Sequence, residues 1–485
     1  MRITLGILIC LFICEIYAQP SFVTNISNQY DDWTGSLIED DLDGYVISGI
    51  SGDNLDPSTI RSYIYRISFI GDTIGYKINM GDTIIWLHYL SKTSQEQFFG
   101  LGTYGVPPVY SQNFLILLFD NNFNIVKCNP IEIDLFERNR ISIIEYRYYN
   151  SQYYTVATIR DYQNAPLTTM FLKINENGDT LRTKIVEDTL YSGGAAFDIE
   201  LSESNGEIWL FGTNFNSSGD VSKIIFDTAF NYLRSQLLNT KLGLNVNTKW
   251  LNDSSLLFGA LYHHLGTNPQ DDDVGISITD TSFSGLEFQF LGSLDTVDYP
   301  AWGRFIDFKN EDSIFYLGTH RVIFDFYPEW PSWIMFGQLD QELNRRFTYY
   351  YGGDAYYWTS DVVATSDGGC IISAQRYDYL YPENGKDLII LKYDRDDLIT
   401  GLPADQHYEN SMSVFPNPGT DRINVMSSLT NGRLLLYNSQ GMLQACRNLE
   451  RGLNSFDVSD LPSGIYVYVI QDEYNILKSD KWIKY

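Results

Sequence analysis

Short apolar runs, separated by polar turns, recur along most of the chain and come in pairs. In each pair the first run ends in a small residue, and the second run follows a polar loop. The first runs are Tyr45–Gly49, Phe98–Gly102, Tyr154–Ala157, Ile208–Gly212, Leu256–Gly259, Ile314–Gly318 and Cys370–Ala374. The second runs are Tyr65–Phe69, Phe114–Phe119, Met170–Ile174, Ser222–Phe226, Val274–Ile278, Trp333–Leu339 and Leu388–Tyr393. The pair returns about every 54 residues, which predicts seven copies of one structural unit.

The residues of each unit favour β-strands. Aromatic and β-branched residues dominate the runs, and turn sequences such as Asn177-Gly178-Asp179-Thr180 lie between units. A unit of roughly three to four short strands cannot bury both of its faces alone, so the units must stack on one another. Seven such units suit a β-propeller, because its ring removes most free strand edges. We therefore predict an all-β fold with a seven-bladed propeller over residues 20–400; a linear β-solenoid, with repeats that are usually shorter, is the alternative.

One unit carries a more specific signature. Asp367-Gly368-Gly369 stands in the expected turn just before the apolar run that begins at Cys370. This segment resembles a blade repeat common in secreted bacterial propellers, in which Asp-Gly-Gly precedes a strand ending in a small residue. The resemblance implies a fold and says nothing about activity.

The N-terminus has the parts of a secretory signal peptide. Arg2 precedes an apolar run from Leu5 to Cys14, and the small residue Ala18 follows. The run is too short to span a membrane, which takes about 20 apolar residues. We predict a signal peptide over residues 1–18, cleaved between Ala18 and Gln19 after passage through the Sec translocon, with a buried strand as the alternative. We expect no transmembrane segment in the mature chain.

The C-terminal residues form short apolar strands between turns that contain proline and glycine. Their most specific positions are Val414, Phe415, Pro416, Asn417, Pro418, Gly441, Gly464, Tyr466, Lys481 and Lys484. In order and spacing these residues resemble the type A C-terminal sorting domain of proteins exported by the type IX secretion system of Gram-negative bacteria. An ordinary immunoglobulin-like adhesion module is the alternative.

The resemblance implies both a fold and a destination. It implies a small immunoglobulin-like β-sandwich over residues 412–485. We predict a short polar linker at 401–411 between this domain and the propeller. It also implies partners in the type IX secretion machinery, and export through the periplasm and outer membrane to the cell surface or the medium.

Charge separates the two predicted domains. The chain has 33 Lys+Arg and 61 Asp+Glu, a formal net charge of −28. Residues 412–485 contain seven residues of each sign, so the excess negative charge belongs to the propeller segment. Because binding to phosphate backbones needs clustered Lys and Arg, we expect no nucleic acid partner.

Sequence motifs for chemistry are absent or weak. The chain has no HExxH, GxSxG or P-loop motif. Two acidic clusters, Asp40–Gly44 and Asp271–Asp273, lack the spacing of a calcium loop, so no cofactor is predicted and calcium at these clusters is a weak alternative. A pair of carboxylates for glycoside hydrolysis must face each other at about 5–9.5 Å, and no pattern among the many acids singles out such a pair.

Aromatic residues are the remaining candidates for ligand contact. They cluster in the sixth and seventh units as Tyr327, Trp330, Trp333 and Trp358. Such side chains stack on sugars or anchor a protein partner, and the same residues also pack between blades. We predict that the propeller binds a glycan or a protein. The alternatives are a secreted hydrolase of the glycosidase kind, with acidic residues in the propeller funnel, and a structural component of the cell envelope.

Overall fold

The computed structural model describes residues 20–484 except for short stretches. The stretches left out are 28–29, 41–42, 54–55, 79–82, 106–110, 136–138, 162–167, 187–195, 203–204, 214–220, 240–241, 265–270, 284–285, 294–295, 326, 383–384, 400–412, 416–418, 428–431, 439–440, 451 and 472–475. The predicted signal peptide, its cleavage site at Ala18 and Gln19, the predicted linker and the Pro416-Asn417-Pro418 motif therefore lie outside the described residues.

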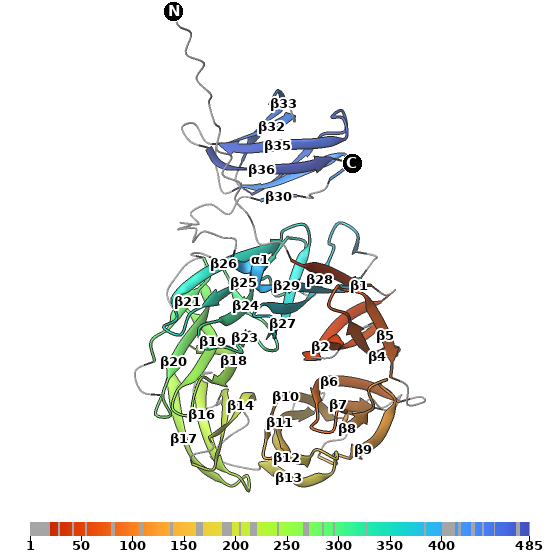
Figure 1. The fold of residues 1–485 in the computed structure, drawn as a ribbon, viewed down its shortest axis with the longest axis vertical. Coiled ribbons are helices and arrows are strands. Elements are labelled where there is room, and N and C mark those ends of the chain that lie inside the picture. Colours follow the sequence, from red (N-terminus) through yellow and green to blue (C-terminus); the bar gives the residue numbers. More distant parts are fainter. Residues whose placement is uncertain are drawn as a thin grey trace, which may run out of the picture.

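Between residues 22 and 393 the described strands form seven antiparallel sheets that follow one another around a ring (Figure 1). Sheet 1 holds β2 (Asp31–Asp40), β3 (Gly44–Asp53), β4 (Asp56–Ile67) and β5 (Thr73–Lys77); sheet 2 holds β6 (Ile84–Lys92), β7 (Phe98–Gly105), β8 (Asn113–Phe119) and β9 (Ile125–Ile131). Sheet 3 holds β10 (Asn139–Tyr149), β11 (Gln152–Asp161), β12 (Thr168–Asn175) and β13 (Thr180–Val186); sheet 4 holds β14 (Ala196–Ser202), β15 (Glu207–Thr213), β16 (Val221–Asp227) and β17 (Tyr232–Asn239). Sheet 5 holds β18 (Leu242–Trp250), β19 (Leu256–His263), β20 (Asp272–Thr279) and β21 (Gln289–Leu291); sheet 6 holds β22 (Tyr299–Pro300), β23 (Ile306–Asp307), β24 (Ile314–His320), β25 (Trp333–Leu339) and β26 (Arg345–Gly352). Sheet 7 holds β27 (Tyr356–Ala364), β28 (Cys370–Tyr377), β29 (Lys386–Tyr393) and β1 (Phe22–Ile26), and the helix α1 (Arg395–Ile399) follows it.

This arrangement is that of a β-propeller, with one sheet for each predicted unit. The first apolar runs lie in β3, β7, β11, β15, β19, β24 and β28, and the second runs lie in or overlap β4, β8, β12, β16, β20, β25 and β29. These are the middle strands of the sheets, and nearly every side chain of β8 and β19 is buried. Strands covered on both faces read as continuous apolar runs, which explains why the repeat was visible in the sequence.

A five-residue turn joins the third strand to the fourth in several sheets. In sheets 2, 4 and 6 it runs over Asp120–Asn124, Asp227–Asn231 and Asp340–Asn344. The Asp120 carboxylate accepts hydrogen bonds from the backbone N–H of Asn122 and Asn124, each at 2.9 Å, and the other two turns are built alike. The fourth residue of each turn has a positive φ of 58–62°. Asp and Asn support such backbone through local hydrogen bonds, so this turn is a second element of the repeat.

The ring is closed by a strand from the N-terminal end. β1 pairs with β29 as the outermost strand of sheet 7, with Phe22 opposite Lys392 and Ile26 opposite Leu388. Just before it, the backbone N–H of Ser21 donates to the Lys392 carbonyl at 2.7 Å. One sheet therefore contains both ends of the propeller, and the ring cannot open unless β1 unpairs.

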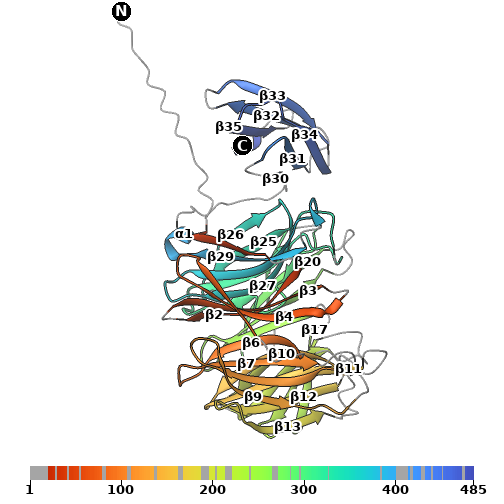
Figure 2. The same ribbon diagram turned by 90° about the vertical axis from the view of Figure 1, so that its right-hand side faces the viewer.

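The seven C-terminal strands gather into one small β-sandwich (Figure 2). One sheet holds β30 (Ser413–Phe415), β31 (Arg422–Ser427) and β34 (Gly452–Asp457); the other holds β33 (Leu443–Leu449), β32 (Gly432–Asn438), β35 (Gly464–Gln471) and β36 (Ile476–Lys484). Its core is a cluster that joins Ile423 and Val425 of the first sheet to Leu436, Tyr468 and Trp482 of the second. The predicted sandwich is present, while its immunoglobulin-like character stays a prediction.

Candidate functional site

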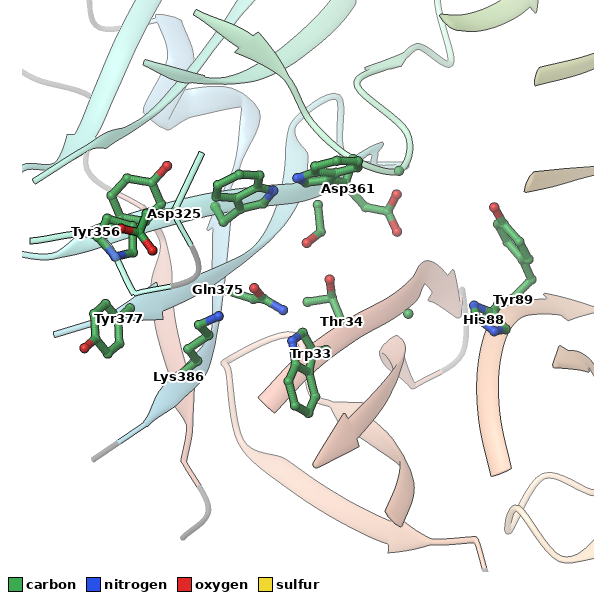
Figure 3. A pocket seen from close by; sticks show the side chains of 16 residues that line it. Trp33, Thr34, His88, Tyr89, Asp325, Tyr356, Asp361, Gln375, Tyr377 and Lys386 are labelled. Carbon is green, nitrogen blue, oxygen red and sulfur yellow. The ribbon is translucent and has the colours of Figure 1, made fainter. Parts of the chain in front are cut away.

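A cavity of about 490 Å³ lies where the innermost strands of sheets 1 and 2 meet sheet 7 and two loops of sheet 6 (Figure 3). Its lining comprises Trp33, Thr34 and Gly35 from sheet 1, His88 and Tyr89 from sheet 2, Trp302, Gly303, Asp325 and Pro328 from sheet 6, and Tyr356, Trp358, Ser360, Asp361, Gln375, Tyr377 and Lys386 from sheet 7. We call it the axial cavity. Its size is in the range of ligand-binding pockets, and its lining mixes aromatic with polar groups as such pockets do.

Sheet 7 supplies one wall of the cavity through its strand register. Tyr356 lies opposite Tyr377, which in turn lies opposite Lys386, and Trp358 lies opposite Gln375. Side chains directly opposite each other in an antiparallel pair point to the same face, so all five project from one face of sheet 7. β2 of sheet 1 brings Trp33 and Thr34 to the other side of the cavity (Figure 3).

Two indole rings stack inside the cavity. The rings of Trp302 and Trp358 lie 5.6 Å apart between centroids at an interplanar angle of 16°. The backbone N–H of Trp302 donates to the Thr359 carbonyl at 3.2 Å, which fixes the loop against β27. Trp302 keeps 53% of its surface exposed, so its ring is available to a ligand.

Burial changes the ionisation of polar groups around the cavity. It lowers the pKa of His88 to about 4, so this ring is neutral near pH 7. Burial also lowers the pKa of Lys386 to about 8, while the nearby Asp31 charge acts in the opposite direction. At neutral pH the cavity therefore contains one cationic side chain, Lys386, and a neutral imidazole.

The carboxylates near the ring axis hold neighbouring sheets together. Asp198 of sheet 4 accepts from the Thr248 backbone N–H of sheet 5 at 2.6 Å and from Arg147 of sheet 3 at 2.8 Å. Asp307 of sheet 6 accepts from the Ala364 backbone N–H of sheet 7 at 2.8 Å. Such bonds occupy the lone pairs that a general acid or base would use, which favours a structural role for these groups.

The acidic cluster Asp271–Asp273 lies between sheets 5 and 6 and bonds to histidines. His263 Nδ1 lies 2.8 Å from an oxygen of Asp272, and His264 Nε2 lies 2.9 Å from an oxygen of Asp273. The other acidic cluster, Asp40–Gly44, is only partly described. Within the described ranges no group of three His, Cys, Asp or Glu side chains is placed to hold a metal ion.

The four candidate aromatic residues occupy different environments. Trp358 lines the axial cavity. Tyr327 stands at its edge, where its hydroxyl donates to Asp31 at 3.0 Å and its ring lies 5.3 Å from that of Tyr377. Trp330 is exposed outside the cavity. Trp333 is buried in β25, 5.6 Å from the His320 ring, and so performs the packing role.

Several cavity residues were not recognised in the sequence. Trp33, Trp302, Asp361 and Gln375 stand outside the aromatic segments that the sequence singles out. The innermost strand β2 mixes apolar with polar residues, so it lacks the continuous apolar run that marks the middle strands. The one usable signal was that Trp33 interrupts a mostly polar segment shortly before a repeat unit.

The sorting motif residues fall into buried and exposed groups. Val414 and Phe415 lie in β30, and Gly441 has a φ of 74° in the turn between β32 and β33. Gly464 begins β35, where Tyr466 is buried 5.9 Å from the Trp482 ring and donates to the Pro462 carbonyl at 2.6 Å. The Lys484 ammonium is buried and donates to the carbonyls of Val458, Ser459 and Leu461 at 2.6, 2.9 and 2.6 Å. Lys481, three positions earlier, is exposed.

Lys484→Met is expected to destabilise the sandwich by about 2–3 kcal/mol, because it removes charged hydrogen bonds to three carbonyls. The exposed Lys481→Met is the matched control and is expected to change stability by less than about 0.5 kcal/mol. Amide hydrogen exchange of β35 and β36 in the full mature chain measures both effects. Equal protection in the two variants would contradict the role of the buried lysine.

Comparison with known proteins identifies the C-terminal domain. Residues 413–485 match the family model described as a secretion system C-terminal sorting domain. The predicted type IX sorting domain is thus confirmed, and it marks the protein for export to the cell surface or the extracellular space through the type IX machinery. No curated protein matches the chain. No helix in the described part of the chain has the length and apolarity to cross a membrane.

Solved structures resemble the chain only distantly. A neuraminidase-like protein of A/little yellow-shouldered bat/Guatemala shares 10% identity, with a TM-score of 0.35 over 77% of this chain and 95% of that one. PorZ, a bacterial surface component of the type IX secretion system of Porphyromonas gingivalis, shares 9%, with a TM-score of 0.27 over 93% and 81%. An alpha-L-arabinanase of Penicillium chrysogenum shares 9%, with a TM-score of 0.39 over 62% and 92%. Values this low transfer no activity to this chain.

Proposed function

We propose that the exported propeller is a binding protein whose axial cavity takes a neutral oligosaccharide. The observation that carries the proposal is the stacked pair Trp302 and Trp358, with Trp33 lining the same cavity. Sugar rings offer C–H faces that pack on indoles and hydroxyls that need hydrogen-bonding partners. Gln375, Ser360 and Lys386 in the lining supply such partners.

The charge of the chain favours an uncharged ligand. The formal net charge is −28, and the excess lies in the propeller segment. A field of this sign disfavours the approach of acidic polymers. A cavity of about 490 Å³ also suits a short sugar chain better than a protein surface, which normally needs about 800 Å² of contact on each partner.

Glycoside hydrolysis is the second candidate function, and the geometry of the cavity supports it less well than binding. Asp325 and Asp361 are the carboxylates of the described lining. Asp361 accepts hydrogen bonds from two backbone N–H groups, on Leu37 and Arg304. A glycosidase requires two carboxylates that are both accessible to the scissile bond, and Asp361 is tied to the backbone instead.

Calorimetric titration of the purified mature protein with trisaccharides of glucose, mannose, galactose and N-acetylglucosamine tests the proposal. We expect at least one trisaccharide to bind, and Trp302→Ala to weaken that binding about tenfold or more through loss of the stacked indole. Trp330→Ala is the matched control, because Trp330 is 49% exposed against 53% for Trp302 but lies outside the cavity.

Three outcomes would contradict the binding proposal. Failure of all four trisaccharides to bind would show that the protein is not an oligosaccharide-binding protein of the proposed kind. If Trp302→Ala and Trp330→Ala weaken trisaccharide binding equally, the axial cavity is not the binding site. Release of smaller sugars during the titration, detected by chromatography, replaces binding with hydrolysis.

A further inference from the structure

Asp361 joins the two sides of the axial cavity. Its Oδ2 accepts a hydrogen bond from the backbone N–H of Leu37 at 3.1 Å, and its Oδ1 accepts one from the backbone N–H of Arg304 at 2.6 Å. Leu37 lies on β2, the strand that carries Trp33, and Arg304 follows Trp302 by two positions. One buried carboxylate, 6% exposed, thus ties both tryptophan-bearing segments to β27.

The backbone around Arg304 is held closely to β27. The Gly303 N–H donates to the Ser360 carbonyl at 2.9 Å, and the Val362 N–H donates to the Arg304 carbonyl at 2.8 Å. A Cβ on Gly303 would lie 2.4 Å from Asp361 Oδ1, so only glycine permits this approach. The loop with Trp302 therefore takes its position from β27, with the Asp361 side chain as one of its attachments.

We propose that ionised Asp361 is a positioning residue that keeps the tryptophan walls of the axial cavity at ligand-binding distance, so that acidification weakens ligand binding. The proposal rests on the oligosaccharide-binding function proposed above. An ionised carboxylate accepts from both backbone N–H groups with its full charge, whereas protonation removes that charge and uses one lone pair of an oxygen for its own O–H, so the carboxyl becomes a weaker acceptor. Protonation therefore weakens the attachment of both tryptophan-bearing segments to β27.

The surroundings of Asp361 set the pH at which this happens. Burial raises the pKa of Asp361 to about 6, and the negative charge of Glu145 in sheet 3 acts in the same direction. The Arg304 guanidinium and the two backbone N–H groups lower this pKa. Two further titratable groups stand on β6. Burial raises the pKa of Tyr89 well above its ordinary value, so its hydroxyl stays neutral. Burial lowers the pKa of His88 to about 4, so its imidazole is neutral at higher pH. Of Asp361, His88 and Tyr89, Asp361 is the one whose pKa lies between 5 and 7.

The first test is the affinity of the tightest of the four trisaccharides at pH 5.0, 6.0 and 7.5. We expect the affinity of the wild type to fall about tenfold from pH 7.5 to pH 5. At pH 5, about one unit below its pKa, Asp361 is ionised in only about one molecule in ten. Asp361→Asn is expected to bind weakly at every pH, because its amide N–H₂ opposes one backbone N–H. Asp325→Asn removes a carboxylate from the same cavity and is expected to keep the wild-type pH profile. A flat wild-type profile, or loss of the profile in Asp325→Asn, would overturn the proposal.

The second test needs no ligand and no variant. Amide hydrogen exchange of the wild type, corrected for the intrinsic effect of pH, is expected to show lower protection of Leu37 and Arg304 at pH 5 than at pH 7. Amides in the middle strands β19 and β20 serve as the internal reference and are expected to keep their protection. Unchanged protection of Leu37 and Arg304 would overturn the positioning role even if sugars bind, whereas failure of sugars to bind with changed protection would overturn only the binding function.

Discussion

Deletion of residues 413–485 is expected to retain the protein in the periplasm. This segment matches the sorting domain family over its full extent, and it has a core of its own around Trp482. The propeller keeps its seven sheets and its closing strand in the truncated chain, because the strands of those sheets lie between residues 22 and 393. Fractionation of cells into periplasm, surface and medium, with immunodetection of the propeller, measures the effect.

A control separates a sorting defect from a folding defect. The truncated protein, purified from the periplasm, is expected to unfold at the same temperature as the propeller of the full chain. Fusion of residues 413–485 to an unrelated periplasmic protein is expected to carry that protein to the surface or the medium. Detection of the truncated propeller on the surface or in the medium would refute the sorting role.

Removal of the closing strand is expected to lower the melting temperature of the propeller by about 10 °C or more. Deletion of residues 20–26 exposes the paired edge of β29 and uncovers Leu388 and Ile390, which are buried in the same cluster as Ile26. Loss of several buried side chains and a ladder of backbone hydrogen bonds removes several kcal/mol. Thermal unfolding followed by circular dichroism of the mature protein measures the shift.

Two point variants test whether the effect comes from packing within this strand. Ile26→Ala is expected to cost about 2–4 kcal/mol, because Ile26 lies in the core cluster shared by sheets 1 and 7. Val23→Ala is the control with a small effect, because Val23 is 41% exposed. A deletion that leaves the melting temperature unchanged would show that the ring is closed without β1.

The sequence predicts the middle of every sheet and says little about its inner and outer strands. The run Phe114–Phe119 is visible because β8 is covered on both faces. β5 is mostly exposed, and β2 has a mixed pattern because it faces both the axis and its neighbours. A strand without one consistently buried face has no period to detect. The closing strand β1 was not predicted because it has only five residues and its partner β29 stands at the far end of the propeller.

The candidate site depends on contacts that no local pattern encodes. Trp358 could be singled out because it lies in a segment rich in aromatic residues. Leu37 and Asp361 are separated by 324 positions, and their hydrogen bond exists only because the ring brings sheets 1 and 7 together. Trp333 and Trp358 are alike in sequence, yet one is buried in β25 and the other lines a cavity, which the strand register decides.

The closing strand also sets the order in which the propeller is completed. β1 precedes every other strand of the propeller along the chain, whereas its partner β29 follows all of them. The Ser21 hydroxyl, next to β1, donates to the carboxylate of Asp397, which is 376 positions away. Contacts of such separation form late, because the chain between them must be ordered first. The pairing of β1 with β29 is therefore expected to complete the ring after the other sheets have formed, and only then does Ile26 join the core cluster shared by sheets 1 and 7.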